Sequence, residues 1–295
     1  MPKASSNLHA GRLHAILLAA LLWLPCGLAH AQATGEEPVA LVTESTGKAQ
    51  TRVGDQTVAV ALLSEFASGA RVRLYQGARM LVLFYGTAEL YALTGPSLVR
   101  ITETRIEALS GNEAVKQQTL GGRDGKPLLL RAGGITQAGI VVRGLARPIA
   151  ALSMTGGVTL DARPVFRWRE PEVGLDYRFV LRDGTETIIY ERTLRETTLT
   201  LPLEAALNEA QRYRWSVSAK SPAGIDYAVG YRFVLANAQI RHDMANFQPD
   251  AQAGTAQRIA YALWLEQTGL RDEARGYWDS LVADGVPIPV QKPRQ

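Results

Sequence analysis

Residues 213–219 read YRWSVSA, and this stretch decides the fold class of its part of the chain. Apolar and polar side chains alternate along it, which is the pattern of a strand with one face buried and one face in water. The same alternation occurs at residues 177–181 and 231–235, and Asp183-Gly184 predicts a hairpin turn after the first of these runs. The sequence therefore predicts a β region over residues 147–236.

A second β region is expected over residues 38–135, where short alternating runs are broken by glycine. Val72 and Leu74 are expected on a buried face, with Arg71 and Arg73 on the opposite face. Period 2 dominates and no run has helical spacing, so this region is predicted to be antiparallel β. The fold class expected for the whole chain is mainly β.

Three short stretches of this first region resemble the FecR-like periplasmic domain: GKAQTR at residues 47–52, FASGARV at 66–72 and LTGP at 93–96. The resemblance covers roughly residues 38–112 and rests on glycine and apolar positions. It implies a periplasmic β domain in a sensory or envelope-signalling context. The turn near Gly77-Ala78 departs from the family's usual Asp-Gly turn. No cytoplasmic helical segment or spanning helix is expected before the domain, so the family's transmembrane anti-sigma role is not carried over.

The second region resembles a fibronectin type III or similar immunoglobulin-like β-sandwich. The stretch PVFRW at residues 164–168 and the stretch YRWSVSA carry this resemblance. In such folds an early tryptophan packs in the core and a late tyrosine begins a strand. The resemblance therefore implies that Trp168, Trp215 and Tyr213 lie inside.

A C-terminal α-hairpin is predicted over residues 250–284. Residues 255–268 form one expected helix, which Gly269 stops, and Asp272 and Glu273 suit the start of a second. The pair resembles a single tetratricopeptide-like (TPR-like) unit. One such unit cannot bury its own apolar face, so it is expected to dock on the sandwich or on a partner, with docking on the same chain favoured. Tyr277 and Trp278 are the candidate helix-pair interface.

The N-terminus predicts export. Lys3 and Arg12 give a positive segment before an apolar stretch at residues 15–24, and residues 29–31 read AHA. This pattern is typical of a cleaved signal peptide, here residues 1–31 with the cut after Ala31. Ten apolar residues make about 15 Å of helix, too short for a bilayer core of about 30 Å. We therefore expect a periplasmic protein with no stable membrane span after cleavage. An uncleaved anchor and a lipoprotein are the alternatives.

Cleavage would leave few chemically active side chains. It removes the one cysteine and three of the four histidines, so His242 is the histidine that remains. The mature chain would then have 30 basic and 28 acidic residues. A thiol nucleophile and a two-histidine metal site are then excluded. No catalytic residue, metal site, cofactor or nucleic-acid partner is expected.

His242 is expected to be a solvated residue in the connection after the second β region. Residues 121–127, GGRDGKP, are expected to form a hairpin or linker rather than a phosphate-binding loop.

Arginine is the most distinctive residue type of the second region, and several arginines are expected to face away from the core. Their planar forks match carboxylates and phosphates, so this face is a candidate surface for an anionic envelope polymer or an acidic protein partner. Alternatively, it is an ordinary polar outer face paired with Glu186, Glu191 and Glu196. The candidate residues are Arg167, Arg169, Arg178, Arg212, Arg214 and Arg232, with Arg182 on the same strands.

These features predict an exported, non-enzymatic binding or scaffold protein of the cell envelope, with a protein partner there. The competing hypothesis is a carboxylate-dependent glycan hydrolase, for which Glu170, Glu172 and Asp176 are clustered candidates. A carbohydrate-binding envelope protein is a third possibility and requires exposed aromatic side chains.

Overall fold

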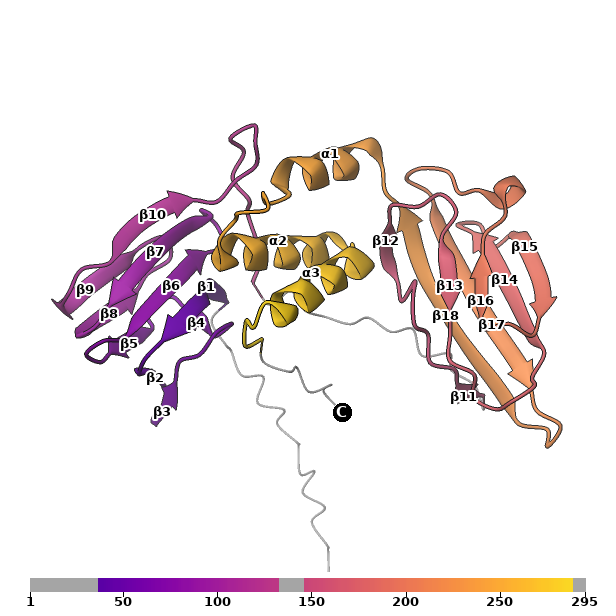
Figure 1. Ribbon diagram of the computed structural model, residues 1–295, viewed down its shortest axis with the longest axis horizontal. Coiled ribbons are helices and arrows are strands. Elements are labelled where there is room, and N and C mark those ends of the chain that lie inside the picture. Colours follow the sequence, from indigo (N-terminus) through magenta and orange to yellow (C-terminus); the bar gives the residue numbers. More distant parts are fainter. Residues whose placement is uncertain (1–36, 133–145, 289–295) are drawn as a thin grey trace, which may run out of the picture. The chain divides into compact units, whose positions relative to one another are not determined.

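The computed structural model describes residues 37–132 and 146–288 (Figure 1). It is mainly β, with several antiparallel sheets followed by three C-terminal helices. The expected signal peptide, residues 1–31, lies outside the described residues. Among the helices of the described ranges, none is both long enough and apolar enough to cross a membrane.

The first β region contains two five-stranded sheets with the orders β10-β7-β6-β1-β4 and β3-β2-β5-β8-β9. All their pairings are antiparallel, and Val72 and Leu74 are buried while Arg71 and Arg73 are exposed, as expected. The strands are β1 (Pro38–Thr46), β2 (Ala49–Val53), β3 (Gln56–Ala59), β4 (Glu65–Ala67), β5 (Arg71–Leu74), β6 (Arg79–Phe84), β7 (Glu89–Thr94), β8 (Ser97–Ile101), β9 (Ile106–Gly111) and β10 (Val115–Thr119).

The second β region is built around β18 (Asp226–Leu235), β17 (Arg212–Lys220), β14 (Tyr177–Asp183) and β15 (Ile188–Leu194), which are antiparallel in that order. The expected hairpin at Asp183-Gly184 joins β14 to β15 and is confirmed. A separate pair is formed by β13 (Val165–Arg167) and β16 (Thr198–Thr200), and the one-turn 3-10 helix η1 (Leu203–Ala205) follows. The short strands β11 (Arg147–Pro148) and β12 (Gly157–Thr159) pair parallel to β18, which no sequence pattern indicated.

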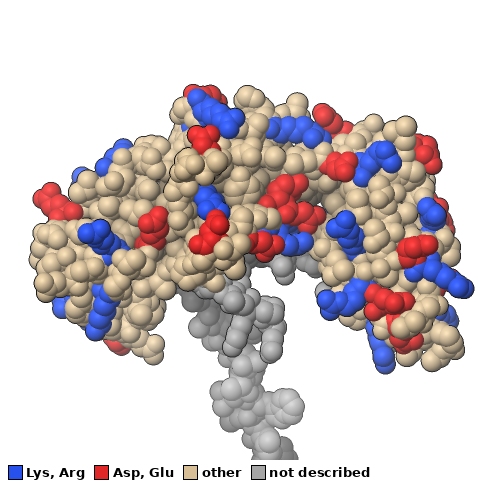
Figure 2. Space-filling view, in the orientation of Figure 1, with Lys and Arg blue, Asp and Glu red and all other residues tan. Residues whose placement is uncertain are grey.

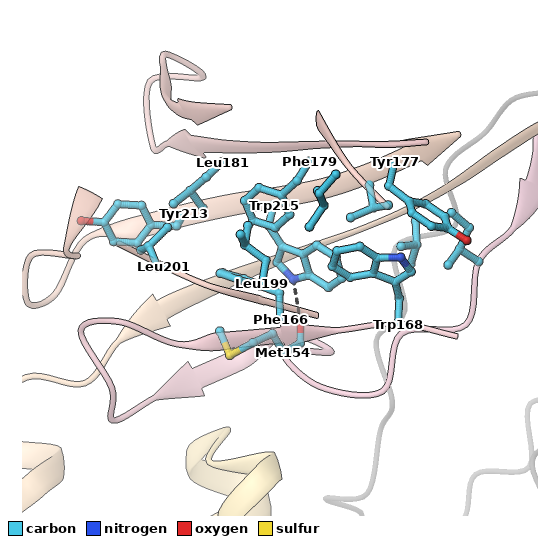
Figure 3. Close-up of a cluster of buried hydrophobic side chains, with 14 of the residues drawn as sticks. Met154, Phe166, Trp168, Tyr177, Phe179, Leu181, Leu199, Leu201, Tyr213 and Trp215 are labelled. Atoms are coloured by element: carbon cyan, nitrogen blue, oxygen red, sulfur yellow. Dashed lines mark hydrogen bonds between the residues drawn. The ribbon is translucent and has the colours of Figure 1, made fainter. Parts of the chain in front are cut away.

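Aromatic side chains fill the core of this second region (Figure 3). Trp168, Trp215 and Tyr213 are at most 3% exposed, so their expected burial is confirmed. The indole Nε1 of Trp215 donates a hydrogen bond to the carbonyl of Met154 at 2.8 Å, and the rings of Trp215 and Phe166 lie 5.3 Å apart. Each such side chain stabilises the fold by roughly 1.5–3 kcal/mol through burial. Burial also removes these three aromatics from any carbohydrate-binding platform.

The predicted C-terminal helices are α2 (Thr255–Thr268) and α3 (Arg271–Ala283), which pack together. Gly269 ends α2 with a left-handed φ of 89°, and the N–H of Leu270 donates to the carbonyl of Leu265 at 2.8 Å. This is the hydrogen bond of a Schellman cap, which favours glycine because a side chain disfavours that backbone conformation. Asp272 and Glu273 occupy the first turn of α3, as expected.

The helix pair docks on the same chain and contacts both β regions. The N–H of Val158 in β12 of the second region donates to the carbonyl of Gly269 at 2.7 Å. The main apolar contact of the pair is with the first β region. Ile259 and Leu265 of α2 share one core with Leu41 of β1 and Leu83 of β6. The reason lies in β1, where four successive residues from Ala40 are buried, so both faces of the strand are covered. One face of β1 packs in the core between the two sheets of this region, and the other face is covered by the helices.

A third helix, α1 (Ala238–Phe247), corrects the expectation of a linker after the second β region. His242 lies on this helix, where it is exposed. The side chain of Asn237 caps the helix by accepting a hydrogen bond from the N–H of Ile240 at 2.9 Å.

The segment at residues 121–127 is a hairpin, closed by a bridge between Gly121 and Pro127, as expected. Asn246 of α1 holds it: its Oδ1 accepts from the N–H of Asp124 at 3.1 Å, and its Nδ2 donates to the Asp124 carboxylate at 2.8 Å. A Cβ on Gly122 would lie 2.1 Å from the Asn246 amide, so a side chain at this position would displace that amide from Asp124.

Candidate functional site

Three arginines form a row across the outer face of the second region's main sheet. Arg182 of β14 lies opposite Arg214 of β17, and Arg214 lies opposite Arg232 of β18. We call Arg182, Arg214 and Arg232 the arginine row. Strands lie about 4.8 Å apart, so the three backbones are neighbours. Like charges in directly opposed positions are destabilising, which makes this register costly unless anions offset it.

The anionic groups around the row are few. Arg214 Nη1 lies 3.5 Å from the Glu186 carboxylate, and Arg182 Nη1 donates to the Glu186 backbone carbonyl at 2.8 Å. Within the described residues, Arg232 has no ion pair. The charge of Arg182 also helps to lower the pKa of the nearby Glu191 carboxylate. The arginine row therefore has three guanidinium groups and one ion pair, that of Arg214 with Glu186.

A strip of small or apolar residues runs beside the row. Val180, Ser216 and Gly230 are paired across β14, β17 and β18, one row along from the arginines. Val180 faces outward by alternation and is still only 6% exposed, so neighbouring side chains cover it. On the far side of the strip, Arg178 pairs with Glu191 at 2.6 Å. The Arg178 hydrogen bond lowers the pKa of Glu191, and Arg178 is thereby partly neutralised.

The remaining predicted arginines divide between the sheets. Arg212 is exposed on β17, two residues before Arg214, and shares its face. Arg167 lies on β13 in the two-stranded sheet, and Arg169 follows that strand. The structure therefore brings Arg178, Arg182, Arg212, Arg214 and Arg232 onto one sheet and leaves the other two elsewhere. Of the expected acidic partners, Glu186 and Glu191 make ion pairs, whereas Glu196 makes none with the described residues.

Tyr277 and Trp278 contact the neighbouring helix of the same chain. The Tyr277 ring meets Tyr261 edge-on, with ring centroids 4.8 Å apart. Trp278 Nε1 donates to Glu266 Oε1 at 2.8 Å. Both residues are partly buried by these contacts, so much of the candidate helix-pair interface is used within the chain.

The same helix pair holds two largely buried carboxyl groups, Glu266 and Glu273. The sequence indicated Glu273 only as a helix-start residue and did not indicate Glu266. Burial raises the pKa of Glu266 on α2 and of Glu273 on α3 above the usual range. The Oε2 atom of each has no hydrogen-bond partner within the described ranges. Their positions on the inner side of an amphipathic helix pair are a signal that helical spacing could have revealed.

Each of the three carboxylates that the hydrolase hypothesis would use makes a hydrogen bond or an ion pair within the chain. Glu170 accepts the N–H of Gly174 at 2.9 Å, Glu172 accepts the Tyr227 hydroxyl, and Asp176 pairs with Arg195 at 2.8 Å. In the part of the chain that the structure describes, no three metal-ligand side chains gather at one place.

Acidic and basic side chains are interspersed over the face of the molecule that Figure 2 shows. The arginine row is thus a local charge feature that arises from strand register. Comparison with known proteins adds no identity: no protein-family model matches the chain, and no curated protein matches it.

Proposed function

We propose that the chain is an exported, non-enzymatic binding or scaffold protein of the periplasm, which recognises an anionic partner through the arginine row. The observation that carries this proposal is the register of Arg182, Arg214 and Arg232, which make one ion pair among the described residues. An anionic partner would supply the missing counter-charge and relieve repulsion on the sheet.

A fibronectin- or immunoglobulin-like sandwich is the scaffold we propose for this surface. Two observations support it: the order β18-β17-β14-β15 beside the separate β13-β16 pair, and the buried Trp168. A third is Tyr213 near the start of β17, whose hydroxyl accepts the N–H of Asn208 at 2.8 Å. This backward hydrogen bond is the feature called a tyrosine corner in such sandwiches.

For the first region we propose a FecR-like domain, and its glycines support this. Gly47 and Gly69 have left-handed φ values of 74° and 87°. A Cβ on Gly95 would lie 1.9 Å from the Tyr75 carbonyl oxygen. The glycines through which the sequence resembles that family therefore occupy positions that require glycine here. A sensory or envelope-signalling context follows from this resemblance.

The partner we propose is an anionic envelope polymer, because an extended row of arginine forks suits repeated phosphate or carboxylate groups. The test is retention of the full chain on immobilised lipopolysaccharide and on heparin across a salt gradient. Arg214→Gln/Arg232→Gln removes two charges from the row and is expected to elute at clearly lower salt. The control Arg167→Gln/Arg169→Gln removes the same charge from β13 and the residues that follow it, and is expected to elute later than the row variant.

Equal losses in the two double variants would reject the arginine row as the site. Retention that is weak and unchanged in both would reject an anionic polymer. Capture of an acidic protein from crosslinked periplasm by the parent chain, but not by the row variant, would replace the polymer with a protein partner.

A further inference from the structure

A second basic surface lies on the outer face of the sheet β3-β2-β5-β8-β9, in the first β region. Arg71 of β5 lies opposite Arg100 of β8, and Arg73 lies opposite Leu98. Arg100 has a counter-charge in Glu107, at 4.0 Å. Arg73 is exposed and has no ion pair with the described residues.

Beside Arg73 the surface is hollowed by about 430 Å³, a volume within the range of small-ligand sites. Four side chains decide its chemistry: Arg73, Tyr75, Leu98 and Ser110. Arg73 is the one charged residue among those that line the hollow, and the lining includes no acid. Leu98 supplies apolar surface, and Ser110 supplies a hydroxyl group.

Tight main-chain contacts build the end of this hollow. A Cβ on Gly95 would lie 1.9 Å from the Tyr75 carbonyl oxygen, and a Cβ on Gly111 would lie 2.3 Å from the Pro96 carbonyl oxygen. Glycine therefore lets the ends of β5, β8 and β9 approach closely. These main-chain contacts hold the Gly111 end of the hollow in place before any ligand binds, which lowers the ordering cost of binding there.

The Tyr75 ring is also held in place. Its hydroxyl donates to Gln50 Oε1 at 2.8 Å, and Lys48 Nζ lies 4.6 Å from its ring centroid. Lys48 thus adds a second cation near the hollow. A fixed aromatic ring, an apolar residue and an unpaired guanidinium favour a compact ligand that carries one anionic group.

We infer that this hollow binds a small carboxylate-bearing ligand, with the carboxylate on the Arg73 fork and the body of the ligand against Tyr75 and Leu98. A sugar acid and the C-terminal end of a peptide share this chemistry and have suitable sizes. The inference does not depend on the proposed function of the arginine row, which lies on another sheet.

The test titrates the full chain with D-glucuronate and with acetyl-alanyl-alanine, followed by amide chemical shifts. D-Glucose and the amidated dipeptide are the matched neutral probes. We expect shifts at Tyr75, Leu98 and Ser110 with at least one acid, and about tenfold weaker binding of its neutral counterpart. The acid that binds more tightly identifies the source of the carboxylate.

Arg73→Gln is expected to weaken binding of that acid by about tenfold, and Arg52→Gln, an exposed arginine of β2 outside the hollow, to leave it unchanged. Ser110→Phe, at an exposed lining position, is expected to fill the hollow and abolish the shifts. The inference is overturned if neither acid binds, if the neutral probes bind equally, or if Arg73→Gln and Arg52→Gln have equal effects. Arg214→Gln/Arg232→Gln should not change this binding, so the two proposals fail separately.

Discussion

Tyr177 and Tyr213 lie in the same buried core, but their hydroxyl groups have different surroundings. The Tyr213 hydroxyl accepts the Asn208 N–H and donates to Gln211 at 3.1 Å. Within the described residues, the Tyr177 hydroxyl is buried without a hydrogen-bond partner. A buried hydroxyl stabilises a fold only when its hydrogen bonds are made, because it has lost those to water.

Removing the two hydroxyls should therefore change stability in opposite directions. We expect Tyr213→Phe to lower the free energy of unfolding by about 0.5–1.5 kcal/mol. Tyr177→Phe keeps the ring against Trp168 and should leave stability unchanged or raise it by up to about 1 kcal/mol. Urea unfolding of both variants measures the difference. Equal destabilisation would show that the Tyr177 hydroxyl has a stabilising role.

At the residue scale, the sequence predicted which side chains are buried but not which arginines are adjacent. Alternation alone places Trp215 inside and Arg214 outside, since side chains of a strand alternate between its faces. Whether Arg214 lies beside Arg182 depends on the register of strands more than thirty residues apart in the chain. A slip of one residue would exchange the faces, and a slip of two would separate the arginines.

Among the elements, helix α1 was not expected from the sequence. Its polar composition resembles that of a connection, yet Ile240, Met244 and Phe247 follow helical spacing after the cap Asn237. The sequence alone therefore could have predicted this helix. It could not have predicted the role of Asn246, because the partner Asp124 lies 122 residues away in the chain.

The helix pair α2–α3 should make the protein less stable as pH rises. Burial raises the folded-state pKa of Glu266 and Glu273, so the folded chain holds these protons more tightly than the unfolded chain. The unfolding free energy from these groups is then highest below the ordinary carboxyl pKa of 4.5. It falls as pH rises through the raised values and is constant above them.

Glu266→Gln/Glu273→Gln should reduce this dependence, since glutamine does not titrate and still offers an oxygen to Trp278. The difference between thermal midpoints at about pH 5 and about pH 8 should be smaller in the double variant than in the parent chain. Glu103→Gln, at an exposed site, is the control and should retain the parent's difference. If the double variant kept the full difference in thermal midpoint of the parent chain, that difference would come from other titrating groups.

At the scale of the whole molecule, the last helices of the chain complete the core of its first β region. The sequence indicated that the helix pair needed a partner surface but not which one. The apolar run at residues 40–42 was the available signal, since a strand with both faces buried must be covered on both sides. A short apolar run fits a strand that is buried on both faces, and it also fits a segment of a buried helix. Only the structure distinguishes the two.

This packing predicts that a change in α2 will loosen strands far away in sequence. Ile259 is fully buried in the core that it shares with Leu83 of β6, so Ile259→Ala should cost about 2–5 kcal/mol. Amide hydrogen exchange should become faster at Leu83, because opening of the helix pair uncovers that sheet. Leu203→Ala, at a position 73% exposed, is the control and should change neither quantity appreciably. If Ile259→Ala left exchange in β6 unchanged, the apolar face of α2 would have to serve a separate partner instead of its own chain.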